Sequence, residues 1–345
     1  MNLLNIEISY YDESFRCQIK PTALDFLKQL KGLSIFDIKG LDQTRTRVIT
    51  TLIHGNEPSG FIACHLWLRS SDVPATNLRI IFCNPEAART RPIFSNRYLA
   101  HSEDLNRYFS VPESDQSEVA IRARKIQQAI KEVNPEAIID LHNTSGASPA
   151  FSVAITEDDR TLDLVCLFTR NHILTGLTVG ALMEQSFDAP LATIECGGAN
   201  EIYSHQVAAD GIQAYISREN LFDRSFYNHM AHRVEVHRDP IRVELVGEAS
   251  VGFSHNRLPT TDITLNSDIE QLNRQKTSAG EFLGWCGENR TLPLQAIDEQ
   301  GINQIENLIE QKNGCLFAKQ SMQLFMVTTI LEIATNDCLF YATIE

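Results

Sequence analysis

Short runs of apolar and β-branched residues alternate with helical patterns through the first two-thirds of the chain. These runs predict strands at 47–53, 77–83, 136–141, 150–155 and 191–196. Several of them are almost continuously apolar, as is usual for strands that are covered on both faces of a sheet. The alternation of strands with helices predicts an α/β domain with a mixed, mostly parallel sheet.

Helices are predicted between these strands, at 58–68, 117–133 and 206–220. The first of them has Pro58 near its start, where a proline suits a helix N-terminus. The second is marked by apolar residues that recur at spacings of four, three, four and three, at Val119, Ala123, Ile126, Ile130 and Val133. This spacing produces one apolar face on an amphipathic helix.

The pattern changes after about residue 233. Short β segments broken at Asp239–Pro240 are followed by a polar helix over 300–311 and a β-rich run over 324–333. We therefore predict two domains, a large one over 1–234 and a smaller, β-rich C-terminal one over 235–345. A chain of 345 residues is long enough for this division.

Composition and charge narrow the range of partners. The formal net charge of −14 argues against nucleic acid and against an anionic membrane surface. No stretch is long and apolar enough to span a bilayer, and the N-terminus does not resemble a signal peptide. The eight cysteines form no CxxC pair and are scattered, mostly inside apolar segments, a pattern that fits reduced core thiols and predicts a cytoplasmic protein. The sequence leaves the oligomeric state open, and a homo-oligomer is compatible with it.

Polar residues with metal-binding chemistry follow two of the predicted strands. His54 and Glu57 lie in the segment TLIHGNEPSG, and His142 ends the segment IIDLH. Two histidines and one glutamate form a known catalytic zinc set that leaves a fourth position for water or substrate. The sequence thus predicts one Zn²⁺ per chain, with Asp140 either a hydrogen-bond partner of His142 or an unrelated strand residue. The alternative is that HxxE is a chance match and that His142 is a core histidine.

Glu195 lies in an otherwise apolar strand, LATIEC, just before two glycines. A buried carboxylate is costly without a partner, so Glu195 is a candidate general base and acid. The alternative is a structural glutamate in a salt bridge. Cys196 is expected on the opposite face of the strand, which argues against a thiol nucleophile. His229 and His232 lie three residues apart in a polar stretch and are interpreted as surface residues.

A segment rich in arginine, NPEAARTRPIFSNRYLAHSEDLNRYF, lies between the two metal-binding segments. Arginine binds carboxylates and can stabilise a developing oxyanion. A long irregular segment near a strand end is a plausible substrate loop, and the alternative is a solvated surface loop.

The ordered set HGNE, NP, DLNR, DLHN and IECGG resembles the succinylglutamate desuccinylases and aspartoacylases, within the wider group of zinc carboxypeptidase-like hydrolases. The resemblance covers roughly residues 47–200. It implies a carboxypeptidase-like α/β/α sandwich with a β-rich C-terminal domain. It also implies zinc ligands at His54, Glu57 and His142, and Glu195 as the general base. By the same resemblance, Arg97 polarises the scissile carbonyl, while Asn106 and Arg107 hold a substrate carboxylate.

One departure concerns the substrate. Aspartoacylases have an arginine about ten residues before the base glutamate, but here the stretch GALMEQSFDAPLATIE has Glu184 and Gln185 near that place. N-acetylaspartate is therefore not indicated. We predict a zinc amidohydrolase that removes an acyl group from an N-acyl amino acid, a small-molecule carboxylate, by attack of zinc-activated water. The alternatives are a peptidase that acts on a short peptide or a γ-linked residue, and a zinc-stabilised binding protein without activity. No GxSxG, GxxxxGK[ST] or GxGxxG motif supports another enzyme class.

Overall fold

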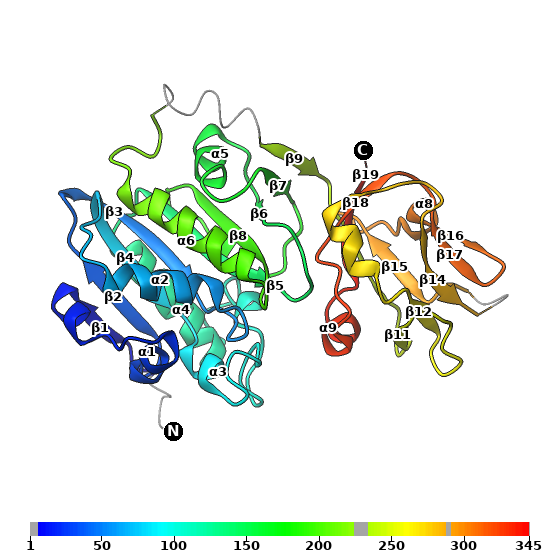
Figure 1. The fold of residues 1–345 in the computed structure, drawn as a ribbon, viewed down its shortest axis with the longest axis horizontal. Coiled ribbons are helices and arrows are strands. Elements are labelled where there is room, and N and C mark those ends of the chain that lie inside the picture. Colours follow the sequence, from blue (N-terminus) through cyan, green and yellow to red (C-terminus); the bar gives the residue numbers. More distant parts are fainter. Residues whose placement is uncertain (1–5, 224–233, 288–290, 345) are drawn as a thin grey trace. The chain divides into compact units, whose positions relative to one another are not determined.

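The computed structural model describes residues 6–223, 234–287 and 291–344, and the chain divides into two compact units (Figure 1). The first unit comprises Met1–Asn143, Ala150–His172 and Thr178–Glu235. The second comprises Thr144–Pro149, Ile173–Leu177 and Val236–Glu345. Each unit has a hydrophobic core of its own.

A large mixed sheet organises the described part of the first unit, and its strands at 171–174 and 235–238 run on into residues of the second unit. Its strand order is β1-β2-β4-β3-β5-β8-β6-β7-β9. The pairs β1–β2, β3–β4 and β3–β5 are parallel, whereas β2–β4 and β6–β8 are antiparallel. The strands are β1 Ser9–Asp12, β2 Ser34–Ile38, β3 Asp42–Thr51, β4 Thr76–Phe82, β5 Ala137–Thr144, β6 Phe151–Ala154, β7 Asn171–Leu174, β8 Leu191–Gly198 and β9 Glu235–Arg238.

Helices cover both faces of this sheet, because successive strand residues point to opposite sides. Ile49 of β3 and Ile139 of β5 pack with apolar residues of α2 and α6, which lie side by side in Figure 1. Their neighbours Val48 and Ile138 pack instead with α4. The result is a three-layer α/β/α arrangement that confirms the predicted fold class. The helices are α1 Ala23–Gln29, α2 Ser59–Arg69, α3 Pro85–Arg89, α4 Glu118–Lys131, α5 Asp159–Val165 and α6 Ile202–Ser217, with short 3-10 helices η1 Glu13–Gln18, η2 Leu105–Arg107 and η3 Leu182–Glu184.

The second unit is rich in β-structure, as expected for the C-terminal region. Its described residues form two five-stranded sheets, β13-β18-β19-β10-β15 and β11-β12-β14-β17-β16, which share one core. The strands are β10 Ile241–Leu245, β11 Val251–Phe253, β12 Ile263–Leu265, β13 Lys276–Thr277, β14 Phe282–Cys286, β15 Leu294–Ile297, β16 Ile309–Lys312, β17 Cys315–Ala318, β18 Met322–Phe325 and β19 Phe340–Ile344; the helices are η5 Ile269–Arg274, α8 Ile305–Leu308 and α9 Leu331–Asn336.

Two predictions in the C-terminal region are wrong. The polar helix expected over 300–311 is reduced to α8, because Ile309–Lys312 pair with β17 as strand β16. The β-rich run expected over 324–333 ends at Phe325, where Met326 has a φ of 57° that breaks the extended backbone. The chain then turns into helix α9.

Candidate metal centre

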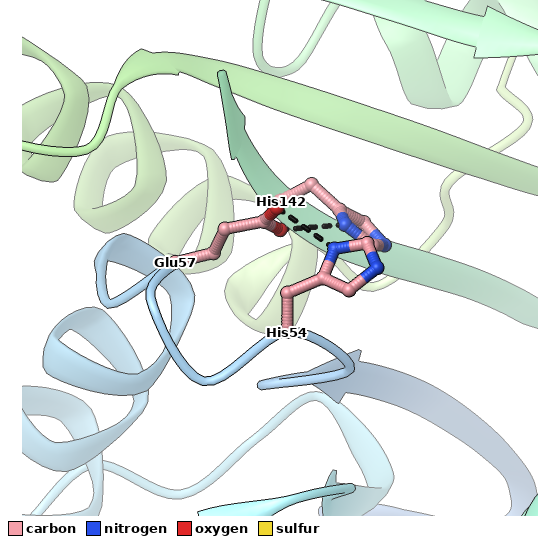
Figure 2. A group of neighbouring side chains, drawn as sticks. All are labelled: His54, Glu57 and His142. Atoms are coloured by element: carbon pink, nitrogen blue, oxygen red, sulfur yellow. Dashed lines mark hydrogen bonds and ion pairs between the residues drawn. The ribbon is translucent and has the colours of Figure 1, made fainter. Parts of the chain in front are cut away.

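His54, Glu57 and His142 come together at the ends of two neighbouring parallel strands. His54 follows β3, Glu57 lies just before α2, and His142 lies near the end of β5. All three side chains are buried, and each offers one ligand atom so that these atoms lie within 4.8 Å of one another (Figure 2). The carboxylate of Glu57 contacts Nδ1 of both histidines, at 2.8 Å from His54 and 2.7 Å from His142. Among the described residues, this is the one group of side chains that could hold a metal ion.

A second carboxylate holds the outer nitrogen of each histidine. Nε2 of His54 lies 2.8 Å from Oδ1 of Asp104, and Nε2 of His142 lies 2.9 Å from Oδ2 of Asp140. Metal-binding histidines in proteins usually have such a partner on the ring nitrogen that does not bind the metal. Two Nδ1 atoms and one carboxylate also match the donor set of catalytic zinc sites. These side chains therefore fit a zinc ion.

The charges around the histidines favour a cation at this centre. Burial lowers the pKa of His142, but the carboxylates of Asp140 and Glu57 outweigh burial and raise that pKa well above its usual value. For His54, burial and the charge of Arg97 lower the pKa, and Glu57 and Asp104 outweigh them in the same way. The carboxylates thus stabilise positive charge where the three candidate ligands meet.

Glu195 is positioned by β8, the strand next to β5 in the sheet. Its side chain is buried, and its Oε2 atom has no hydrogen-bond partner. Burial is the main cause that raises the pKa of Glu195 to about 7, and the charges of His142 and Glu57 also act on this carboxyl. A carboxyl group with a pKa near neutrality can both accept and donate a proton.

Arg97 lies beside the candidate ligands and is half-buried. Its guanidinium donates to Asp104 through Nε at 3.0 Å, and its Nη2 lies 2.9 Å from the same carboxylate oxygen in an ion pair. Its Nη1 lies 3.5 Å from Glu57 Oε1. The segment that carries it also shapes the turn at the first ligand pair, because the amide of Gly55 donates to the carbonyl of Arg97 at 2.9 Å. Arg97 is therefore brought to the centre as a positive charge.

Asn106 and Arg107 lie in η2, two and three residues after Asp104. Oδ1 of Asn106 accepts a hydrogen bond from the amide of Leu182 at 3.0 Å. The guanidinium of Arg107 donates to the carbonyl of Asn106 at 3.2 Å. Both residues are thus in the segment that contacts His54, while their role in holding a substrate carboxylate stays a prediction.

The stretch before Glu195 places no positive charge here, because residues 180–190 contain neither lysine nor arginine. Glu184 folds back on its own loop, and its carboxylate accepts hydrogen bonds from the amides of Val179, Gly180 and Ala181. Gln185 donates to Ser110 Oγ and accepts from Gln127. The side chains of Glu184 and Gln185 are therefore committed to structural contacts.

Two further residues at the centre were not predicted from the sequence. Asp104 begins the DLNR motif and bonds to His54, Arg97 and the amide of Asn106. Asn143 follows His142, donates to Gly197 O and Ser59 Oγ, and accepts from the amide of Ser59. Both residues are close in the sequence to predicted site residues, and this closeness was the signal that could have identified them. His229 and His232 lie outside the described residues.

Comparison with known proteins identifies a related family. Residues 43–214 match the family model described as the succinylglutamate desuccinylase/aspartoacylase catalytic domain. No curated protein sequence matches the chain significantly. None of the described helices is long and apolar enough to cross a membrane.

Three solved structures show the same fold, each covering 90% of this chain and 88% of the other. They are a succinylglutamate desuccinylase/aspartoacylase from Rhodobacter sphaeroides (TM-score 0.56, 13% identity), a succinylglutamate desuccinylase from Silicibacter sp. TM1040 (TM-score 0.55, 17% identity) and the product-bound ectoine utilization protein EutE (DoeB) from Ruegeria pomeroyi (TM-score 0.54, 15% identity). Through residues 43–214, the chain therefore belongs to the succinylglutamate desuccinylase/aspartoacylase family of hydrolases, as its ordered motifs predicted.

Proposed function

We propose that this chain is a zinc-dependent amidohydrolase that removes the acyl group from an N-acyl amino acid, with one Zn²⁺ held by His54, Glu57 and His142. The observation that carries the proposal is the buried carboxyl of Glu195. One of its oxygens has no hydrogen-bond partner, and the charges of the candidate ligands affect its pKa. When bound, zinc lowers the pKa of water to roughly 7 and polarises a carbonyl oxygen.

The chain's own residues supply the proton transfer. Glu195 accepts the proton of the water that attacks the amide carbonyl, and it returns that proton to the leaving nitrogen. Its pKa of about 7 suits both steps, because a group that titrates near the working pH exchanges protons readily in both directions. Arg97 stabilises the negative charge that develops on the carbonyl oxygen.

Asn106 and Arg107 hold the carboxylate of the amino acid in this proposal. An arginine guanidinium matches a carboxylate in geometry as well as in charge. Their support is indirect: η2 begins at the residue after Asp104, whose carboxylate contacts His54. We also propose a cytoplasmic location, which is supported by eight free cysteines.

A hydrolysis screen tests the proposal. Zinc-loaded protein is incubated with N-acetyl, N-succinyl and N-formyl amino acids, with a set of dipeptides alongside, and the released amine is quantified. We expect turnover of at least one N-acyl amino acid. Turnover of dipeptides alone would replace the proposal with a peptidase, and no turnover of any compound would contradict it.

The variant Glu195→Gln tests the proton transfer. It keeps the size of the side chain but cannot accept a proton, so we expect kcat to fall by about 10²- to 10⁴-fold. Zinc content, measured by atomic absorption, should stay at one per chain because Glu195 is not a proposed ligand. Full activity in this variant would refute the assignment of Glu195.

A further inference from the structure

The carboxylate of Asp104 divides its two oxygens between different parts of the centre. Oδ1 lies 2.8 Å from Nε2 of His54 and accepts from the amide of Asn106 at 2.9 Å. Oδ2 accepts a hydrogen bond from Nε of Arg97 at 3.0 Å, and Nη2 of Arg97 lies 2.9 Å from the same oxygen in an ion pair. One rigid, planar group therefore joins a candidate metal ligand, the proposed oxyanion-stabilising arginine and the backbone of a proposed substrate-binding residue.

The contact with Asp104 restricts the orientation of the Arg97 side chain, which the irregular backbone around Arg97 does not restrict by itself. Arg97 lies outside the helices and strands, and its long side chain has many rotamers. One guanidinium nitrogen donates to Oδ2 and a second lies in ion-pair contact with it, so the contact restricts the direction of the guanidinium as well as its distance. Because the other oxygen bonds to His54, the position of Arg97 is set relative to the metal-binding ring.

The corresponding carboxylate on the other histidine lacks this connection. Asp140 bonds to His142, to Thr50 Oγ1 at 2.7 Å and to Thr193 Oγ1 at 3.5 Å, with no cation among these partners. Asp140 thus orients one ligand only. The pair Asp37–Arg79 offers the reverse comparison, with two contacts of 2.7 Å and no candidate ligand involved.

We propose that Asp104 is a positioning residue that sets Arg97 relative to the metal centre through a carboxylate shared with His54. The inference rests on the proposed function for the role of Arg97 in the reaction. It makes the strength of metal binding and the placement of the carbonyl-polarising charge depend on the same side chain.

The variant Asp104→Asn separates the two contacts, because an amide keeps one oxygen acceptor and replaces the other with an N–H donor. That single acceptor can serve His54 or Arg97 but not both. Asp140→Asn perturbs a ligand partner alone, and Asp37→Asn is the matched control for loss of an Asp–Arg pair. Circular dichroism melting identifies which variants are folded.

Three measurements follow for each folded variant. Zinc affinity is measured by competition with a chromophoric chelator. The values of kcat and KM are measured at saturating zinc with the substrate found in the screen. The rate at which the Arg97 Nε proton exchanges with solvent is measured by NMR. We expect Asp104→Asn to weaken zinc binding or to lower kcat at unchanged KM, and in both cases to speed exchange of the Arg97 proton. A loss of zinc affinity from either ligand-partner variant should be about 10- to 100-fold. Asp140→Asn should leave Arg97 exchange unchanged, and Asp37→Asn should change none of these values.

A double-mutant cycle identifies the route of the effect. If Asp104 acts through Arg97, the kcat losses of Asp104→Asn and Arg97→Ala should not multiply in the double variant. If Asp104→Asn does not fold, Arg97→Lys takes its place: it keeps the charge but offers a single nitrogen, so kcat should fall while zinc affinity stays within twofold.

Independent kcat losses, unchanged Arg97 exchange in Asp104→Asn, or full kcat in Arg97→Lys would overturn the proposal. If the wild type hydrolyses nothing in the screen, the proposed function fails. The exchange rate of the Arg97 Nε proton and the zinc affinity of Asp104→Asn then still decide whether Asp104 links Arg97 to His54.

Discussion

Gly55, between the two ligands of the HGNE motif, gives the sharpest test of how the centre is built. A Cβ atom at this position would lie closest to the amide nitrogen of Ala88, 2.6 Å from the carbonyl carbon of Ala87 and 2.7 Å from the carbonyl oxygen of Asn96. All three are backbone atoms, and two of them belong to helix α3. Since backbone cannot rotate away as a side chain can, Gly55→Ala must displace the turn that carries His54 and Glu57.

The size of the effect follows from the cost of an extra methyl in a packed site. Such overpacking typically costs about 1–3 kcal/mol, which corresponds to roughly a 5- to 140-fold change in an equilibrium constant. If the turn moves to relieve the contact, the two ligands leave their positions and the loss appears in zinc affinity. If the turn holds, the loss appears in the free energy of unfolding.

The assay measures both quantities for the same protein. Zinc affinity is obtained by chelator competition, and the free energy of unfolding of the metal-free chain by urea denaturation. Gly32→Ala is the matched control, because its Cβ would lie 2.9 Å from Oε1 of Glu86, the far end of a flexible side chain that can shift. If Gly55→Ala matches wild type in both measurements, or differs no more than Gly32→Ala, the packing argument is wrong.

Two further predictions concern the whole chain. Zinc at a thousandfold excess over its Kd should add about 4 kcal/mol to the free energy of unfolding and so raise the melting temperature. A chelator or the variant His142→Ala should remove this rise in melting temperature. An unchanged melting curve would contradict the proposed site. At pH 8 the exposed Cys17 should react rapidly with a disulfide reagent, whereas burial raises the pKa of the Cys64, Cys83 and Cys196 thiols, which should stay protonated and react only after unfolding. Counting fast-reacting thiols with and without denaturant checks this, and rapid labelling of the three buried thiols in the native chain would refute it.

The fold was predictable where the hydrophobic pattern was strong. Strands β3, β4, β5, β6 and β8 and helices α2, α4 and α6 all lie at or within a few residues of their predicted places. The pattern was informative there because each element buries a regular face against the large sheet. In the second unit, short strands end at single backbone positions such as Met326, whose positive φ has no clear sequence signal.

The candidate metal ligands could be picked out from the sequence because each of them follows or ends a predicted strand. His54 and His142 are brought together by the parallel pairing of β3 with β5, a pairing that the apolar runs did not specify. The link between Asp104 and His54 was not predictable, because it spans fifty positions between two irregular segments. Hydrogen bonds of this kind depend on loop conformation, for which periodicity gives no information.

The division of the chain into two units has a consequence for any attempt to separate them. The backbone passes from one unit to the other five times, after Asn143, Pro149, His172, Leu177 and Glu235. The first passage comes one residue after the candidate ligand His142. The short piece that begins there is tied into the second unit, where Asn273 donates to the carbonyl of Ala147 and Glu270 accepts from its amide. A chain cut at residue 235 would therefore leave two incomplete fragments, so the strand that carries His142 and the β-rich unit have to be expressed and engineered together.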